Sequence, residues 1–91
     1  MIHHVDIDFR KQFNKQLAKS PEKIKQAFRD RIKLFIADRY NPLLRTHALK
    51  GRFEGYRSIN ITGDWRAVFK KMEDDKIIFV AIGTHSQLYK K

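Results

Sequence analysis

The chain has no cysteine among its 91 residues, which excludes disulfide bonds and thiolate metal sites. It has no apolar signal core near its N-terminus, and no apolar run approaches the roughly 20 residues of a membrane-spanning helix. We therefore expect a soluble cytoplasmic protein. A chain of this length is expected to form one domain, residues 1–91, around a single modest core.

Acidic residues are scarce, since ten Asp and Glu accompany 20 Lys and Arg for a formal net charge of +10. The imbalance is strongest between residues 45 and 71, where seven basic residues accompany only Glu54 and Asp64. Aromatic residues are interleaved with these cations, namely Phe53, Tyr56, Trp65 and Phe69. Cations bind phosphates and aromatic rings stack on unpaired bases, so this segment suits a nucleic acid. The alternative interpretation is ordinary solvated surface charge.

The first half of the chain has the pattern of a short strand and two helices. Imperfect alternation predicts a strand over Ile2–Ile7. Asp8 is expected to cap a helix whose apolar positions recur every four residues, at Phe9, Phe13 and Leu17. Ser20-Pro21-Glu22 predicts the cap and first turn of a second helix. That helix should end before Asn41-Pro42 and bury one face, consisting of Ile24, Ala27, Phe28, Ile32, Phe35 and Ile36.

After Gly55 the apolar period changes to two, which predicts three strands joined by short turns: Tyr56–Ile61, Trp65–Lys71 and Lys76–Thr84. The order β-α-α-β-β-β predicts an α+β fold with a helical hairpin on one face of a mainly antiparallel sheet. If Ile59 and Ile61 face the helices, the other face is open and polar. With Trp65, Ala67 and Phe69 in the core, that open face carries Ser58, Asn60, Arg66 and Lys70.

Residues suited to phosphodiester chemistry gather in the second half of the chain. His47, Asp64 and His85 supply two imidazoles and a carboxylate, which can move protons, and nearby cations can hold a phosphate. No metal or nucleotide cofactor is predicted. His4, Asp6 and Asp8 share one face of the first strand, but three ligands on one short strand converge poorly on a metal ion.

Several motifs resemble those of the RelE/ParE toxin superfamily, in particular its YafQ-like branch. In chain order they are His47-Ala48-Leu49-Lys50-Gly51, Gly55-Tyr56-Arg57, Asp64-Trp65 and Gly83-Thr84-His85-x-x-Leu88-Tyr89. The likeness spans nearly the whole chain and is specific from His47 onward. It implies a RelE-like fold and a toxin that enters the ribosomal A site and cuts messenger RNA without a metal. It also implies a cognate antitoxin, and the +10 charge predicts that this partner is acidic.

The resemblance assigns site roles to His47, Asp64, Trp65, His85 and Tyr89, and Arg66 matches an arginine of RelE-like members near the scissile phosphate. We expect His85 to be the principal proton-transfer residue, acting as the acid, with His47 or Asp64 as the base. Arg66 and Lys50 would stabilise phosphoryl charge. Further RNA contacts are predicted at Arg52, Arg57, Asn60, Trp65 and Tyr89.

Asn60 departs from the YafQ-like pattern, in which this position is a histidine. Asparagine forms hydrogen bonds but takes up no proton near neutral pH. Any acid–base duty of that histidine must therefore pass to another residue here, or the rate must be lower.

Two other functions are compatible with these residues. A ParE-like toxin would inhibit DNA gyrase by binding and would need no catalytic histidine. A decayed toxin would bind RNA or the ribosome without cutting it. Three of the residues also have a purely structural interpretation, in which Trp65 packs in the core, Asp64 closes the turn and Tyr89 packs on the sheet edge.

Overall fold

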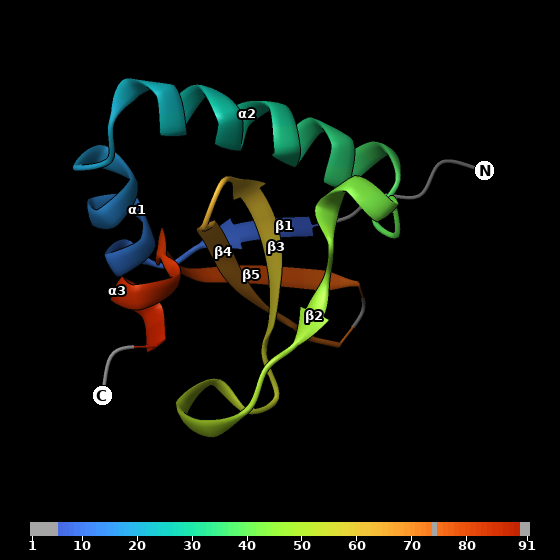
Figure 1. The fold of residues 1–91 in the computed structure, drawn as a ribbon. Coiled ribbons are helices and arrows are strands. Elements are labelled where there is room, and N and C mark those ends of the chain that lie inside the picture. The colour runs from blue at the N-terminus through green and yellow to red at the C-terminus, as the bar shows by residue number, and fades with distance from the viewer. Residues whose placement is uncertain (1–5, 74, 90–91) are drawn as a thin grey trace.

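A five-stranded mixed sheet forms the centre of the computed structural model, which describes residues 6–73 and 75–89 (Figure 1). The strands lie in the order β1-β5-β4-β3-β2. Their bounds are Asp6–Phe9 for β1, His47–Ala48 for β2, Arg57–Thr62 for β3, Trp65–Lys71 for β4 and Lys76–Thr84 for β5. The pair β1–β5 is parallel and the other three pairs are antiparallel. The predicted α+β fold with a mainly antiparallel sheet is confirmed.

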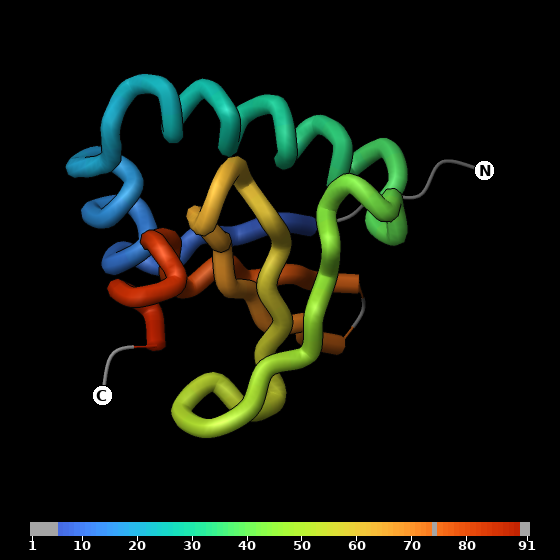
Figure 2. The backbone as a smooth tube through the Cα atoms, viewed as in Figure 1, coloured from blue at the N-terminus to red at the C-terminus, as the bar shows by residue number. Residues whose placement is uncertain are grey.

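Two main helices, α1 (Lys11–Ala18) and α2 (Glu22–Ala37), pack against one face of this sheet (Figures 1 and 2). Helix α1 lies against β5, and α2 lies against β3. The shorter helices are η1 (Pro42–Leu44), η2 (Gly51–Phe53) and α3 (His85–Tyr89). None of the helices in the described residues has the length and apolarity that a membrane crossing needs.

Phenylalanine dominates the core on the helix face. The rings of Phe13 and Phe28 have centroids 5.2 Å apart, and those of Phe69 and Phe79 are 5.3 Å apart. Ile59 and Ile61 lie in the same core, as the alternation in this strand predicts. Such aromatic side chains bury large apolar areas, so this layer supplies most of the hydrophobic stabilisation.

The two predicted helix caps are wrong. Asp8 lies in β1, where its carboxylate is 3.1 Å from Lys76 Nζ. Pairing with β5 continues to Arg10, whose N–H donates to the Phe79 carbonyl over 2.9 Å, and therefore α1 begins only afterwards. Ser20 closes α1 by donating its hydroxyl to the Gln16 carbonyl over 2.8 Å, and α2 starts after Pro21. The predicted strand over Ile2–Ile7 lies largely outside the described residues, and only its end falls within β1.

The predicted buried face of α2 is correct for five of its six positions but wrong for Ile36, which is 55% exposed. Phe35, the preceding residue, is fully buried against Phe69 and Phe79. Adjacent helix positions point about 100° apart, so both cannot face the sheet at this end of the helix. The helix ends at Ala37, before Asn41-Pro42 as predicted.

The face of the sheet away from α1 and α2, called the open face below, is less polar than predicted. Ser58 is only 2% exposed, and Val68 and Ala81 are buried beside it. These residues lie under Leu88 of α3, and a ring of half-buried side chains completes the cluster: Leu49, Phe53, Tyr56, Val80 and Tyr89. The open face therefore has a small second core whose main structural effect is to hold α3.

Two β-bulges decide which side chains reach each face. Between β4 and β5 the register passes from Val68↔Ala81 to Phe69↔Phe79, so Val80 has no partner. Val80 and Ala81 both reach the open-face cluster, and Ile82 returns to the main core. A second shift between Asn60 and Thr62 leaves the buried Ile61 unpaired. Bulges of this kind re-aim side chains next to functional sites.

Candidate functional site

The candidate site lies where the β3–β4 turn meets the start of α3. The backbone N–H of His85 donates to the carbonyl of Asp64 over 2.9 Å. This bond joins two motifs that are 21 positions apart in the chain. Both side chains are exposed. We call the set formed by Asn60, Gly63, Asp64, Arg66, His85 and Tyr89 the hairpin corner.

A reciprocal pair of hydrogen bonds starts α3. The Gln87 backbone N–H donates to Thr84 Oγ1 over 3.2 Å, and the Thr84 N–H donates to Gln87 Oε1 over 2.8 Å. This is the capping-box arrangement of a Thr-x-x-Gln sequence. It fixes the first turn of the helix, on which His85 lies.

Gly83 lets α3 fold back closely over the sheet. A Cβ atom at this position would lie 3.0 Å from Gln87 Oε1 and 3.3 Å from Gln87 Cβ. Because these atoms belong to the capping box, any larger residue would push against the start of the helix. The glycine therefore helps to set the position of His85.

Asn60 and Arg66 are directly opposite each other in the β3–β4 pair. Asn60 Nδ2 donates to the Gly63 carbonyl over 3.2 Å, and Arg66 Nη1 donates to the same carbonyl over 3.0 Å. Arg66 Nη1 also donates to the Trp65 carbonyl over 3.1 Å. Within residues 6–73 and 75–89 its Nε and Nη2 groups have no hydrogen-bond partner and its guanidinium no ion pair. A half-buried guanidinium held in this way is ready to bind an oxyanion.

Tyr89 packs against His85, one helical turn away, with ring centroids 4.6 Å apart and the ring planes tilted by 58°. The other side of Tyr89 meets Phe53 in an edge-to-face contact with centroids 6.1 Å apart. Tyr89 is therefore packed and not frayed. Its contacts restrict the orientation of the His85 imidazole.

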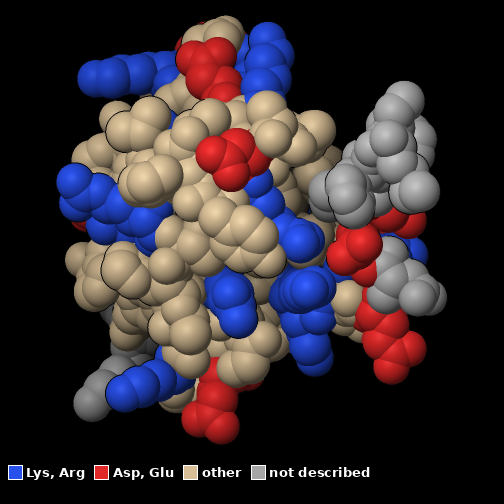
Figure 3. Space-filling model, turned by 90° about the vertical axis from the view of Figure 1, so that its right-hand side faces the viewer, with Lys and Arg blue, Asp and Glu red and all other residues tan. Residues whose placement is uncertain are grey.

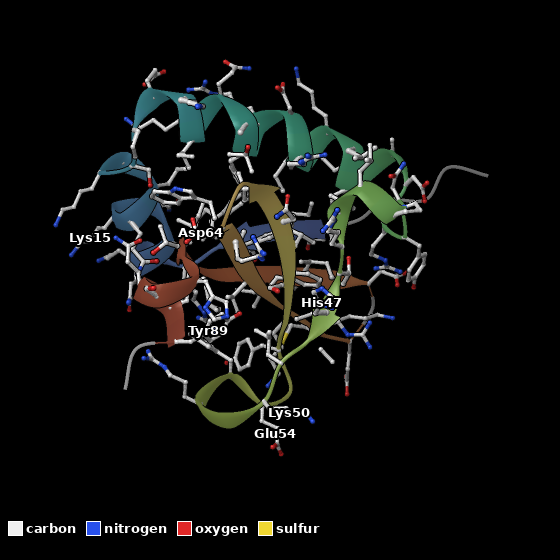
Figure 4. The ribbon with its side chains drawn as sticks, in the orientation of Figure 1. Lys15, His47, Lys50, Glu54, Asp64 and Tyr89 are labelled. Carbon is white, nitrogen blue, oxygen red and sulfur yellow. The ribbon has the colours of Figure 1, made fainter. Side chains whose placement is uncertain are left out.

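His47 is on the same side of the sheet as the hairpin corner but is not in contact with it. It lies in β2 opposite Ser58, which pairs with Val68 and, through it, with Ala81 of β5. Directly opposite residues share a face, so His47 belongs to the open face. Neighbouring strands lie about 4.8 Å apart, so the three strand-to-strand steps from β2 to β5 place His47 roughly 14 Å from Ala81. Figure 4 shows His47 across the sheet from Asp64 and Tyr89.

Trp65 lies on the helix side of β4 and not on the open face. Its half-buried ring packs against the main core. It also lines a hollow of about 320 Å³ with residues from the end of α1, from β5 and from α3, including Lys19, Ile82 and Leu88. This position agrees better with a packing role than with stacking on a base across the open face.

The predicted cationic contacts are distributed over three places. Lys50 lies on the projecting loop after β2, as Figure 4 shows. Arg52 lies over the Phe53 ring, 4.9 Å from its centroid, and lines a hollow beside α1. Arg57 pairs with Phe69 and therefore belongs to the helix face. Of the three, Arg57 is thus directed away from the hairpin corner.

Metal ligands do not gather in the described part of the chain. Within residues 6–73 and 75–89 no three His, Asp or Glu side chains are placed to hold a metal ion. His4, considered with Asp6 and Asp8 in the sequence, lies outside the described residues.

The arrangement of strands and helices is that of the RelE-like class of small toxins. The E. coli DinJ–YafQ complex contains a chain 27% identical to this one, with a TM-score of 0.75, covering 94% of this chain and 99% of that chain. A YafQ structure from E. coli BL21(DE3) is 22% identical, with a TM-score of 0.77 and the same coverage. A YoeB/ParE toxin from Agrobacterium tumefaciens shares the fold at 17% identity and a TM-score of 0.72, covering 88% of this chain and 98% of that chain. None of the curated proteins compared with the chain matches it in sequence.

A family profile described as bacterial toxin of type II toxin–antitoxin system, YafQ, matches residues 5–90. The chain belongs to this YafQ family of toxins. The matched region spans β1 through α3 and therefore includes every residue of the hairpin corner. Solved structures of this fold include toxin–antitoxin complexes, among them DinJ–YafQ from E. coli and RelBE2 from Mycobacterium tuberculosis.

Proposed function

We propose that this toxin is a metal-independent, ribosome-dependent endoribonuclease that cuts messenger RNA in the ribosomal A site. The supporting observation is the hairpin corner, where backbone contacts bring together the segments that bear an imidazole, a carboxylate and a partly unpaired guanidinium. RNA can be cut by its own 2′-hydroxyl if a base, an acid and an oxyanion donor are supplied. The corner offers one group of each kind.

In the proposed reaction, the 2′-oxygen attacks the adjacent phosphorus as its proton passes to the carboxylate of Asp64. The new bond to phosphorus forms while the bond to the 5′-oxygen breaks. His85, as the imidazolium, gives its proton to that leaving oxygen. The products are a 2′,3′-cyclic phosphate and a 5′-hydroxyl, and no oxidant, metal or water is consumed in this step.

Asp64 suits the role of base better than His47. The backbone of Asp64 is hydrogen-bonded to that of His85. His47 lies in β2, three strands away from β5, which leads into His85. One phosphodiester in contact with His85 cannot at the same time reach a side chain at the far edge of the sheet. We assign His47 to a neighbouring phosphate of the bound strand instead.

Arg66 is the proposed oxyanion donor. Its Nη1 group is anchored by two backbone carbonyls, and a fixed donor stabilises developing charge without reorganising during the reaction. Asn60, opposite Arg66, helps to hold the Gly63 carbonyl that anchors the arginine. Asn60 therefore acts as a positioning residue in this chain, where the YafQ-like pattern has a histidine.

The RNA path runs from the hairpin corner over the open face toward β2. His47 lies at the far side of this path, and Lys70 lies above the Tyr56 ring, 5.4 Å from its centroid. Lys50 and Arg52 on the projecting loop border the same side. Phosphates bound to these cations would fix the strand, while Tyr89 places a base beside His85.

The proposal is tested by primer extension on messenger RNA after adding the purified protein to a translation system. Discrete cuts are expected with the parent and with His47→Gln, and Asp64→Asn should cut about 100-fold more slowly or worse. The same rate in Asp64→Asn and parent would exclude the assigned base. Absence of cuts together with inhibition of DNA supercoiling by purified gyrase would establish the ParE-like alternative.

A further inference from the structure

Another hollow lies on the other side of the molecule from the hairpin corner, beneath the end of α2. Its volume is about 90 Å³, the space of about three water molecules. Strand register places Arg57 and Lys71 on the helix face here, opposite Phe69 and Ile77 respectively. The lining residues are Arg39, Tyr40, Thr46, Arg57, Phe69, Lys71 and Ile77. We call this hollow the α2-end pocket.

Three cations border the α2-end pocket, and no acidic residue in the described part of the chain pairs with them. Within residues 6–73 and 75–89, Arg39, Arg57 and Lys71 take part in no ion pair. The hydrogen bond that the structure gives Arg39 is a long one, 3.5 Å from Nη2 to the hydroxyl of Tyr40. Three like charges around one small hollow repel one another unless an anion lies between them.

Two buried donors in the pocket also have no acceptor. Arg39 Nη1 and Thr46 Oγ1 are both inaccessible to solvent and make no hydrogen bond within the described chain. Buried polar atoms are normally hydrogen-bonded, and an unsatisfied one is costly. Both residues line the same hollow as Arg57 and Lys71, so these unpaired donors lie close to the space in which an anion would bind.

Three large side chains close to Arg39 in the sequence are exposed. Tyr40 is 72% exposed, Leu43 in η1 is 61% exposed and Ile36 near the end of α2 is 55% exposed. Figure 3 shows this side of the molecule, where Lys and Arg side chains lie among uncharged ones across the middle of the surface, with a few acidic side chains beside them. Aliphatic side chains such as Ile36 and Leu43 offer no ring for a base to stack on. They favour a protein partner over RNA.

We propose that the α2-end pocket binds a carboxylate from an acidic segment of the cognate antitoxin, with apolar residues of that segment packed on Ile36, Tyr40 and Leu43. A carboxylate can accept paired hydrogen bonds from an arginine fork, and its charge matches the three cations. The pocket is an anchor point for the antitoxin away from the hairpin corner. This assignment rests on the antitoxin partnership and does not require that the toxin cuts RNA.

The test is calorimetric titration of the purified toxin with its antitoxin, expressed from the neighbouring reading frame. Arg39→Gln/Arg57→Gln should weaken binding by about 100-fold, because two partners of a buried carboxylate are removed. The matched control is Lys23→Gln/Lys33→Gln, which removes the same charge from exposed positions of α2. It should weaken binding by less than about threefold.

Equal losses of antitoxin affinity in the two double variants would overturn the proposal, because they would show that binding depends only on the overall charge of the toxin. Unchanged antitoxin affinity in Arg39→Gln/Arg57→Gln, with loss of ribosome binding, would also overturn it and assign the pocket to RNA phosphate. If that variant does not fold, the exposed Lys71→Gln replaces it, with about a tenfold loss expected and no loss contradicting the proposal. A toxin that fails to cut messenger RNA leaves this titration intact, so the two proposals fail separately.

Discussion

The two faces of the sheet are built for different purposes. The helix face buries an aromatic core in which Phe13, Phe35 and Phe79 are fully covered. The open face has a much smaller core of Val68, Ala81 and Leu88, which holds one short helix. Stability therefore depends mainly on the first face, and the position of the candidate site depends on the second. Substitutions on the two faces should separate folding from activity.

The largest loss of stability is expected from a substitution on the helix face. Phe79→Ala removes a ring that contacts Phe9, Phe13, Phe28, Phe35 and Phe69. Loss of a fully buried phenylalanine typically lowers the free energy of unfolding by about 3–5 kcal/mol. Urea denaturation followed by circular dichroism should show this loss. A change below about 1 kcal/mol would contradict the importance given to this layer.

On the open face, Leu88→Ala should lower the free energy of unfolding by about 2 kcal/mol. This is the lower end of the range for leucine, because α3 lies at the surface and can shift to fill part of the cavity. Its effect on messenger cleavage should be larger than this loss of folded protein explains, since α3 carries His85 and Tyr89. The measurement is cleavage rate at a temperature where the variant is folded. Equal activity of Leu88→Ala and parent would show that α3 does not position the site.

A milder change to the same helix is Thr84→Ala, which removes one half of the capping box. Loss of such a cap costs about 1 kcal/mol. We expect a small decrease in melting temperature and a several-fold decrease in cleavage rate, both restored in part by Thr84→Ser, whose hydroxyl can accept the same bond from Gln87. Failure of serine to restore what alanine removes would assign the effect to the threonine methyl group.

The smallest effect should follow Asn60→His, which introduces the histidine of the YafQ-like pattern at the hairpin corner. An added imidazole opposite Arg66 should raise the cleavage rate and make it depend more strongly on pH near neutrality. A several-fold increase is expected, and Asn60→Gln serves as the control without a titratable group. A decrease with histidine and none with glutamine would show that the asparagine is required to hold the Gly63 carbonyl.

Periodicity and turn signals were enough to predict the main elements. The bounds predicted for β4 and β5 agree with the structure, and β3 is displaced by one residue. The facing of Ile59, Ile61, Ala67 and Phe69 toward the helices is also confirmed. These features depend on local alternation, which the chain displays directly.

The features that escaped prediction depend on contacts between distant segments. The bulge at Val80 changes the alternation of β5 without a glycine or proline to mark it. The two-residue strand β2 exists only through its pairing with β3. Helix α3 did have a local signal, since Thr84-x-x-Gln87 is a capping-box sequence.

The candidate site was predicted as a set of residues but not as an arrangement. The motifs containing Asp64 and His85 come together, whereas His47 stays across the sheet. Arg57 was placed with the RNA contacts by charge alone, and the register turns it toward the α2-end pocket. Charge and residue type reveal which groups are present, but strand register decides which of them meet.

The hydrogen bond between His85 and Asp64 has a consequence for biosynthesis. Helix α3 follows every strand in chain order and comes directly after β5, which pairs with both β1 and β4. Because the sheet cannot be completed without β5, the fold and the proposed nuclease chemistry would arise together, once this segment is made. The cell would thus be exposed to the toxin only after the domain is finished, which gives an antitoxin time to engage it.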